Sequence, residues 1–426
     1  MKYRRSMSFA AAMLLLCAGL TGCGKQESDT PASPTVQAAD LTEEIKPQNV
    51  TGADPDEPFC EAQTAFALKL MQETVKKQKD NVLISPYSVM QALAMTANGA
   101  NGNTLTQMEQ ALGGMPVSDL NPYLLTQRTN QPNTDTCKLL CANSLWIRDE
   151  GDRIKAEPDF LQTNVDYYGA PAYLRPFDQS TADEINRWCS EHTDQMIPQM
   201  LDEIQPSDVM YLINAVVFDA KWAQKYTNEP TDRKFTAQNG STQTAQMMYS
   251  DESVYLEDAH AVGFMKPYEG GRYAFAALLP EEGLSVTDYL AGLTPDALRE
   301  TLTAPEYCDV STGIPEFSYD FDTEMSEQLS AMGMAGAFDE NADFSRMAKT
   351  ASGVLFIDKV LHKTHIEVDT EGTKAAAVTA VSMSDECEAV LPEVKYVILD
   401  RPFLYMIVDT ETNLPVFMGI LTELPA

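Results

Sequence analysis

The spacing of apolar residues changes along the chain, and each spacing predicts a different kind of element. Apolar side chains recur at helical intervals in residues 61–79, whereas residues 82–84 form a short, wholly apolar run that stops at Ser85-Pro86. Helical spacing returns in residues 89–95 and again in residues 105–112. We therefore expect a helix, a buried strand and two further helices in this order.

Strand patterns predominate farther along the chain. Apolar or alternating runs of strand length occur at residues 139–147, 211–218, 273–279, 354–368 and 403–408. Helical patterns intervene at residues 182–193 and 322–332, and no internal repeat is present. This mixture predicts a single α+β domain over residues 59–426, built around a large sheet.

The first 22 residues have the pattern of a targeting segment. Basic residues at positions 2, 4 and 5 precede an apolar run, Phe9 to Leu20, that is too short to span a bilayer comfortably. The residues Leu20-Thr21-Gly22-Cys23 resemble the lipobox of bacterial lipoproteins, in which cleavage precedes the cysteine and its thiol is acylated. The resemblance implies a lipoprotein signal peptide over residues 1–22 and a membrane anchor on Cys23. An ordinary signal peptide with an incidental cysteine is the alternative.

Residues 23–58 are predicted to be an acidic, flexible tether. They are polar and rich in Pro, Ser and Thr, with few large apolar side chains; a removable pro-segment is the alternative. The whole chain has 63 acidic against 30 basic residues and a formal net charge of −33. We therefore expect no binding to nucleic acid, because such binding needs clustered Lys and Arg to displace counterions.

Motifs of catalysis or metal binding are missing from the sequence. Of the four histidines, His362 and His365 lie three apart in a predicted strand, so their side chains should point to opposite faces and make a poor metal pair. We expect no metal, cofactor or catalytic residue. Cys137 and Cys141 are candidates for a disulfide, and reduced, buried thiols are the equal alternative.

One segment near the end of the chain, residues 367–389, combines helix and strand features. Small and β-branched residues follow Gly372, and an acidic stretch precedes Pro392. With a period of two from Thr373, one face would hold only small residues, while Lys374 falls on the other face. Such a segment suits a chain that is an exposed loop in one state and a buried central strand in another.

Several segments of the chain resemble the serpin family, in the family's order and over roughly residues 60–425. They are Asn81–Ser88 with 99–113, Ala142–Trp146, Ile185–Ile197, Leu212–Val216 with Lys221-Trp222, His362-Lys363, Glu371–Thr373, Arg401–Leu404 and Phe417–Gly419. The resemblance implies a fold of three β-sheets and about nine helices with an exposed reactive-centre loop. It also implies an irreversible suicide-substrate inhibitor of serine, and sometimes cysteine, proteases, with no catalytic residue of its own.

The resemblance further assigns roles to particular residues. The hinge that enters the sheet would comprise Glu371, Gly372, Thr373, Ala375, Ala376 and Ala377. The polar shutter cluster, whose hydrogen bonds rearrange as the sheet opens, would comprise Ser85, Ser88, Asn214 and His362. A charge or a proline at Thr373 would block insertion, and the small residues present there favour an inhibitor.

The cleaved bond is less well defined. The family's usual spacing from Gly372 places it between Glu386 and Cys387, whereas counting back from Pro392 favours Glu388, and counting from Pro402 leads to a position near Leu391. Cleavage after Glu386 would fit a protease that prefers Glu or Asp. A bond beside Met383 or Ala389 would instead fit an elastase-like or chymotrypsin-like protease.

Two other functions are alternatives to inhibition. A non-inhibitory member would act as a binding or display module at the cell surface. A cysteine peptidase using Cys387 would need a histidine and an orienting residue held near it, and an acidic loop is a poor place for that arrangement. We expect a monomer that forms a covalent complex with its target protease, lipid-anchored at the bacterial cell surface and also shed from it.

The assignment of the cleaved bond predicts a particular peptide. Challenge with the target protease should release a small C-terminal fragment that begins at Cys387, because attack on the Glu386 carbonyl leaves the following residue as the new amino terminus. Mass spectrometry of the released fragment measures this directly. A fragment beginning at any other residue would refute Glu386.

Overall fold

The computed structural model describes residues 39–78, 80–149, 154–205, 208–350, 355–373 and 394–425, all in one compact unit. The α-helices in these ranges are α1 Glu57–Val75, α2 Pro86–Ala97, α3 Gly102–Ala111, α4 Val117–Thr129, α5 Pro158–Thr163, α6 Gln179–His192, α7 Val286–Gly292, α8 Pro295–Thr303 and α9 Ser326–Leu329. Short π or 3₁₀ turns occupy Asn164–Tyr168, Ser330–Met334 and Ala335–Ala337.

Three sheets order the strands of the described residues. The strands are β1 Ala39–Asp40, β2 Val82–Ile84, β3 Cys137–Arg148, β4 Ile154–Ala156, β5 Ala172–Arg175, β6 Met210–Lys221, β7 Thr231–Thr236, β8 Thr242–Glu257, β9 Ala261–Pro267, β10 Tyr273–Pro280, β11 Glu306–Pro315, β12 Phe317–Glu324, β13 Ala348–Thr350, β14 Lys359–Val368, β15 Gly372–Thr373, β16 Lys395–Ile398, β17 Phe403–Asp409 and β18 Leu414–Leu421. A seven-stranded sheet has the order β1-β5-β3-β6-β15-β14-β12, and β6 also pairs directly with β14. A nine-stranded sheet has the order β16-β11-β8-β9-β10-β17-β18-β2 with β7 beside β8, and β13 pairs with β4. The predicted α+β fold with three sheets is confirmed.

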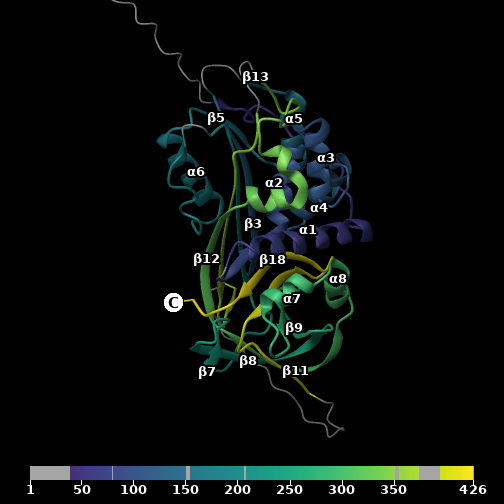
Figure 1. Cartoon of the computed structure of the whole chain (residues 1–426), viewed down its shortest axis with the longest axis vertical. Coiled ribbons are helices and arrows are strands. Elements are labelled where there is room, and N and C mark those ends of the chain that lie inside the picture. The colour runs from purple at the N-terminus through teal and green to yellow at the C-terminus, as the bar shows by residue number, and fades with distance from the viewer. Residues whose placement is uncertain are drawn as a thin grey trace, which may run out of the picture. The chain divides into compact units, whose positions relative to one another are not determined.

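The seven-stranded sheet is covered on both faces (Figure 1). On one face Tyr211, Ile213 and Val217 of β6 pack in a cluster with Ile185 and Trp188 of α6. The alternate residues of β6 belong to the main core, which also contains α2. Because both faces are buried, β6 is apolar at almost every position, and its sequence shows no alternation.

The helices that flank this sheet begin at side chains that cap them. Asp56 accepts a hydrogen bond from the Phe59 N–H at the start of α1, and Ser85 accepts one from the Ser88 N–H at the start of α2. Asp178 caps α6 in the same way. The cap at Ser85 matters most for the site, because it places two serines at the junction between β2 and α2.

The structure corrects two expectations about element boundaries. Residues 322–332 were predicted as a helix, but 322–324 end strand β12, and α9 spans only Ser326–Leu329 before a π turn. Phe321, Met325 and Leu329 keep a helical spacing although Phe321 lies in β12 and Leu329 in α9, because all three side chains are buried.

The predicted tether also ends earlier than expected. Ala39 and Asp40 pair with β5, and the Leu41 N–H donates to the Ala172 carbonyl. The Ala53 N–H donates to the Pro122 carbonyl, and α1 begins at Glu57. Residues 39–58 are therefore part of the folded unit, because backbone hydrogen bonds anchor a segment whose side chains are largely polar. Residues 23–38 lie outside the described residues.

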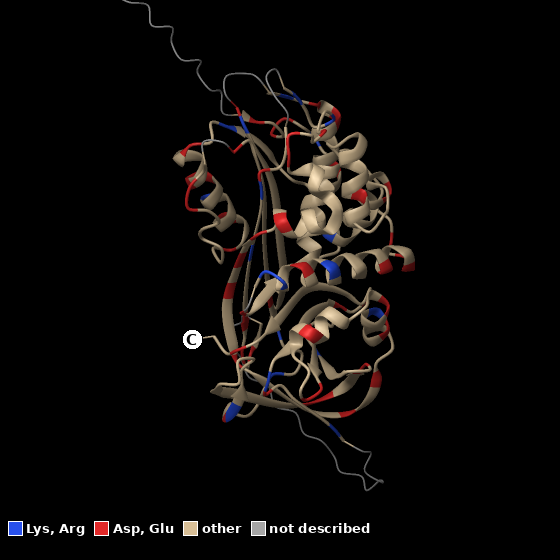
Figure 2. Cartoon of the chain, in the orientation of Figure 1, with Lys and Arg blue, Asp and Glu red and all other residues tan. Residues whose placement is uncertain are grey.

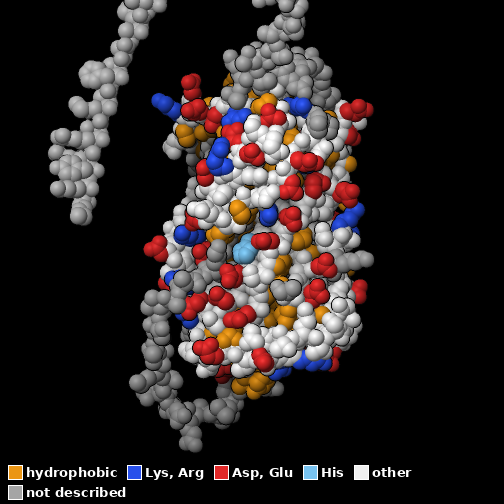
Figure 3. Space-filling model, turned by 90° about the vertical axis from the view of Figure 1, so that its left-hand side faces the viewer, with side chains coloured by type: hydrophobic (Ala, Val, Ile, Leu, Met, Phe, Trp, Pro, Cys, Tyr) orange, Lys and Arg blue, Asp and Glu red, His pale blue; other side chains and the backbone are white. Residues whose placement is uncertain are grey.

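Acidic side chains are spread over helices and sheets alike (Figure 2). On the face shown in Figure 3, red side chains are scattered among hydrophobic and neutral ones, and blue ones are fewer. This distribution agrees with the strong acidic excess of the sequence. None of the helices in the described ranges is long and apolar enough to cross a membrane.

Candidate functional site

Four polar residues from three distant segments meet where α2 lies against the seven-stranded sheet. The Asn214 Oδ1 atom accepts hydrogen bonds from Ser88 Oγ at 2.7 Å and from His362 Nδ1 at 2.6 Å. The His362 Nε2 atom accepts the Ser85 N–H at 3.1 Å, and Ser85 Oγ donates to the Val416 carbonyl at 2.8 Å. All four residues are buried. The structure thus brings together Ser85, Ser88, Asn214 and His362, the four residues that the resemblance assigned to the shutter.

The protonation state of His362 follows from these partners. A backbone N–H can only donate, so Nε2 must be unprotonated and Nδ1 must carry the hydrogen that reaches Asn214. Burial lowers the pKa of His362 to about 3. The ring is therefore neutral at physiological pH. Asn143 on β3 completes the cluster by accepting from Asn214 Nδ2 at 2.6 Å, a contact that sequence spacing gave no means of finding.

His362 and Asn214 are also direct partners in the sheet. Strands β6 and β14 run parallel and pair over seven residues, from Lys359 with Tyr211 to His365 with Val217. We call this ladder the seam. His365 lies on the opposite face from His362 and bonds to Asp320 at 2.8 Å, as the strand periodicity predicted. The seam is the place where another strand would have to separate β6 from β14.

At one end of the seam a short strand already lies between β6 and β14. In β15, Gly372 pairs with Lys221 and Thr373 with Ala220 of β6, and Thr373 also pairs with Val368 of β14. A Cβ atom on Gly372 would lie 2.2 Å from the Ala220 carbonyl oxygen, so only glycine fits there. Three of the predicted hinge residues, Glu371 to Thr373, are thus placed at the entrance to the seam.

A network of hydrogen bonds fixes the turn that leads into β15. The Asp369 carboxylate accepts the Glu371 and Gly372 N–H groups at 2.8 and 3.0 Å. The Trp222 indole N–H donates to the Asp369 carbonyl at 2.8 Å, and Lys225 Nζ lies 2.5 Å from the Glu371 carboxylate. The hydroxyl groups of Tyr268 and Thr373 are 2.6 Å apart. The turn is therefore held by side chains that lie outside β6 and β14.

Several carboxylates lie close to one another around this turn. Burial raises the pKa of Asp369, and the charges of Glu367 and Glu371 act in the same direction, although the two N–H groups oppose them. Burial likewise raises the pKa of Glu316, with further contributions from Asp369 and Glu229. The pKa of each carboxyl is thus raised both by burial and by the neighbouring carboxylates.

A buried ion pair packs against the aromatic side chains that hold the turn. Lys266 is 1% exposed and lies 2.7 Å from the Glu252 carboxylate. Its ammonium group also lies 5.4 Å from the ring centroid of Trp222 and 4.5 Å from that of Tyr226. Trp222 stacks on Tyr268 with ring centroids 4.5 Å apart. Lys266 and Tyr268 could not be identified from the sequence, because each fits the pattern of an ordinary strand residue.

The remaining predicted positions fall in two groups. Ala375, Ala376, Ala377, Glu386, Cys387 and Cys23 lie outside the described residues. Cys137 and Cys141 are both free, so the disulfide alternative is wrong, and burial raises the pKa of their thiols to about 11 and about 12. Within the described ranges no cluster of three His, Cys, Asp or Glu is arranged to hold a metal ion.

Known proteins share this architecture. The family model described as Serpin (serine protease inhibitor) matches residues 61–424. The chain is 29% identical over 391 residues to leukocyte elastase inhibitor A of Mus musculus, over 85% of this chain and 98% of that one. It is 42% identical to tengpin, a thermophilic serpin solved in the native state, with a TM-score of 0.86 over 91% of this chain and 100% of that one. Tengpin in the latent state gives a TM-score of 0.77 at 39% identity, over 88% and 100%, so the native state is the more similar of the two.

The neutral, buried state of His362 predicts a pH dependence of stability. An unfolded histidine titrates near its usual pKa of about 6.5, so between this value and about 3 the unfolded chain binds the additional proton. The stability contributed by the neutral ring is therefore complete above the unfolded pKa and falls as the pH drops, by about 1.4 kcal/mol per pH unit. His362→Gln should lack this loss.

The measurement is the free energy of unfolding of the native form from about pH 7 to about pH 5, in the wild type and in the variant. Buried carboxylates with raised pKa values, such as Asp369, act in the opposite direction, but they are present in both proteins and cancel in the difference. Ser318→Gln, at an exposed position of β12, removes no titratable group, so it is the control and should retain the wild-type slope. An equal slope in His362→Gln and the wild type would contradict the assignment.

Proposed function

Because the chain belongs to the serpin family, we propose that it is an irreversible suicide-substrate inhibitor of serine proteases. Relatives in this family are protease inhibitors rather than enzymes, as the leukocyte elastase inhibitors illustrate. The observation that carries the proposal is β15: a strand that begins with Gly372 and Thr373 already lies between β6 and β14. The entering side chain is small and neutral, so nothing in the described hinge opposes further insertion.

The proposed reaction begins as ordinary proteolysis. The serine oxygen of the protease attacks the Glu386 carbonyl carbon, the bond to Cys387 breaks, and the new amino terminus takes the proton. An ester then joins Glu386 to the protease. Insertion of the freed loop into the central sheet displaces and distorts the attached protease before water can hydrolyse the ester. Inhibition is thus a competition between the rate of insertion and the rate of hydrolysis; loop insertion of this kind is a general serpin property.

The register of β15 supports this mechanism at the residue level. Extended along β6, the pairing of Thr373 with Ala220 would set Thr379 opposite Asn214. Extended along β14, the pairing of Thr373 with Val368 would set the same residue opposite His362. Both extensions agree, so an inserted Thr379 would separate the two seam partners. We propose that Ser85, Ser88, Asn214 and His362 act as the shutter that this step opens.

The target class rests on the loop and on the relatives. A leukocyte elastase inhibitor is among the similar proteins, and cleavage beside Met383 or Ala389 would suit an elastase-like protease. Cleavage after Glu386 would instead suit a protease that prefers acidic residues. The alternative function, a non-inhibitory binding module, predicts cleavage of the loop without a trapped protease.

For the location of the protein, we propose export and lipid anchoring through Cys23 at a bacterial cell surface. The support is the targeting pattern of residues 1–22 and the Leu20–Cys23 motif. Residues 23–38 would then serve as the spacer between the lipid anchor and the folded unit.

The anchor predicts a change in fractionation. Expressed in a bacterium, the full chain should partition with the membrane and incorporate a labelled fatty acid, whereas Cys23→Ser should do neither, because it lacks the acylated thiol. Cys17→Ser, inside the apolar run, is the matched control and should behave as the wild type. Labelled lipid on Cys23→Ser would refute the assignment.

Covalent trapping is tested on denaturing gels. The folded unit is incubated with elastase-like, chymotrypsin-like, trypsin-like and Glu-preferring proteases, and a heat-stable band at the summed mass is expected with the target. Thr373→Arg should abolish that band while the loop is still cleaved and the protease stays active, because an unpaired charge would be buried between β6 and β14. Thr244→Arg, at an exposed position of β8, is the control. A full yield of complex from Thr373→Arg would overturn the insertion step.

A further inference from the structure

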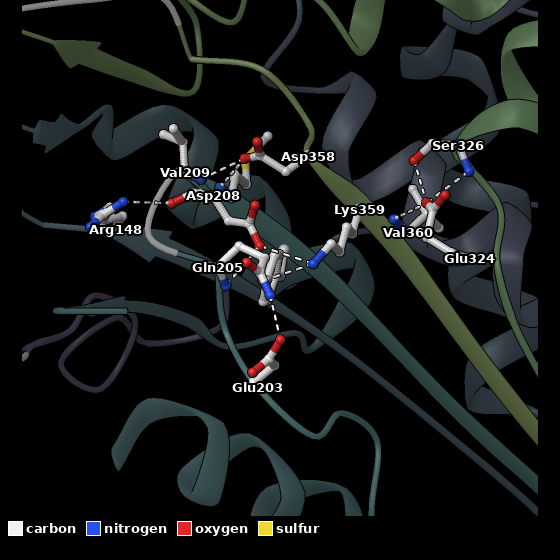
Figure 4. A network of polar contacts seen from close by, with 12 residues as sticks. Arg148, Glu203, Gln205, Asp208, Val209, Glu324, Ser326, Asp358, Lys359 and Val360 are labelled. Atoms are coloured by element: carbon white, nitrogen blue, oxygen red, sulfur yellow. Dashed lines mark hydrogen bonds and ion pairs between the residues drawn. The ribbon is translucent and has the colours of Figure 1, made fainter. Parts of the chain in front are cut away.

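A second polar network lies at the end of the seam farthest from the hinge (Figure 4). Lys359, the first residue of β14, pairs in register with Tyr211 of β6. Its Nζ atom lies 3.0 Å from Asp208 Oδ2 and 3.4 Å from the Tyr211 hydroxyl group. The same hydroxyl group donates to the Asp208 carboxylate. The Lys359 ammonium group is also 5.2 Å from the Tyr211 ring centroid.

A second carboxylate crosses the seam in the opposite direction. Asp358, just before β14, accepts the N–H groups of Val209 and Met210 at 2.5 and 2.9 Å. Its own N–H donates to the Met210 carbonyl at 3.2 Å. The residue just before β14 thus sends its carboxylate to the start of β6, and Asp208, just before β6, sends its carboxylate to Lys359 at the start of β14. We call Asp208, Tyr211, Asp358 and Lys359 the far-end latch.

The charged side chains of this network are largely shielded from solvent. The Asp208 side chain is 8% exposed and that of Lys359 is 30% exposed. Burial alone would raise the pKa of Asp208, but the hydrogen bonds from Tyr211 and Lys359 outweigh it and lower the pKa. The carboxylate is therefore charged at neutral pH, and its ion pair with Lys359 is only partly screened by solvent.

Only some of the nearby contacts cross the seam. The Val360 N–H donates to Glu324 Oε1 at 3.2 Å, and Glu324 belongs to β12, which pairs with β14 on its other side. This bond would move with β14 if the seam opened. The contacts of Lys359 and Asp358 instead reach β6 and the residues just before it. A strand placed between β6 and β14 would separate their partners by one strand spacing, about 4.8 Å, which no hydrogen bond spans.

We propose that the far-end latch is the last contact that loop insertion must break, and that its strength sets how readily the sheet opens over its full length. This inference rests on the proposed function. Extension of the β15 register along both neighbours places residue 382 between Tyr211 and Lys359. Insertion starts at Ala220 and Lys221, so the latch meets the incoming strand last. Its members are positioning residues, because none touches the protease or the cleaved bond.

The latch makes a prediction that a general structural role does not. Lys359→Met keeps the length of the side chain and removes the ion pair, so it should lower the thermal midpoint of the native, uncleaved form. In the loop-cleaved form the wild-type latch is already broken, so the same change should leave that midpoint within error of the wild type. A residue that merely stabilised the fold would lower both midpoints alike. Lys77→Met, which removes an exposed ion pair with Glu327, is the control and should change neither form.

The rate of sheet opening gives an independent readout. On warming, the uncleaved Lys359→Met variant should convert to a heat-resistant, inserted form about fivefold faster than the wild type, the effect expected for loss of one partly exposed charge pair. Asp208→Asn should act in the same direction, and the double variant should be less than additive, since both changes remove one contact. Equal conversion rates in the wild type and both variants would overturn the latch.

The outcomes separate this inference from the proposed function. The loop is cut with a nonspecific protease, so insertion is measured without any trapped target. If cleavage raises the midpoint but Lys359→Met lowers both forms equally, the latch is refuted and the inhibitor proposal stands. If the differential effect is seen but no protease is ever trapped, the latch stands and inhibition is refuted. If cleavage leaves the wild-type midpoint unchanged, the loop does not insert and both are refuted.

Discussion

The parallel ladder between β6 and β14 is the constraint on which the rest of the structure depends. Each of these strands has an antiparallel neighbour on its outer side, β3 for β6 and β12 for β14, and β15 is antiparallel to both. A strand that enters the seam would therefore replace one parallel ladder with two antiparallel ones. Antiparallel pairs are slightly more stable per residue, and two ladders pair more backbone groups than one. The closed sheet could thus gain backbone hydrogen bonds if a strand were inserted at its centre.

Polar side chains are placed along this ladder where an ordinary buried strand would be apolar. At Asn214 and His362 they bond to one another and to α2, and at Lys359 they bond to the residues before β6. Satisfied groups of this kind add little net stability, but each becomes costly when it loses its partner in a dry environment. A seam of this composition is stable while closed and resists partial opening, because every intermediate leaves a buried polar group without its partner.

The ease of prediction differed between the sheet and the site for a physical reason. Strands β2, β10 and β17 are buried along their whole length, so their apolar runs mark their ends to within about a residue. The helix expected over residues 322–332 was wrong at its start, where 322–324 belong to β12, because β12 and α9 bury apolar residues at intervals that a single helix would also give. The shutter residues were found only through resemblance to a family, since Ser85 and His362 are 277 positions apart. Lys266, Asn143 and the far-end latch were missed because their roles arise from partners that the local sequence does not contain.

If the loop inserts as proposed, the contacts at the hinge and those along the seam would change differently, and this difference would set the direction of insertion. The bonds from Trp222 to Asp369 and from Lys225 to Glu371, with the contact of Tyr268 to Thr373, hold the turn before β15. They lie at the end where β15 already separates β6 from β14, so opening the rest of the seam would not require them to break, and they would keep the register in which the next residues enter. The seam contacts, in contrast, must all be exchanged. On the proposed mechanism, a hinge that stays bonded and a ladder that opens stepwise would make insertion start at Ala220 and end at Tyr211, so the contacts between these two positions would govern its rate.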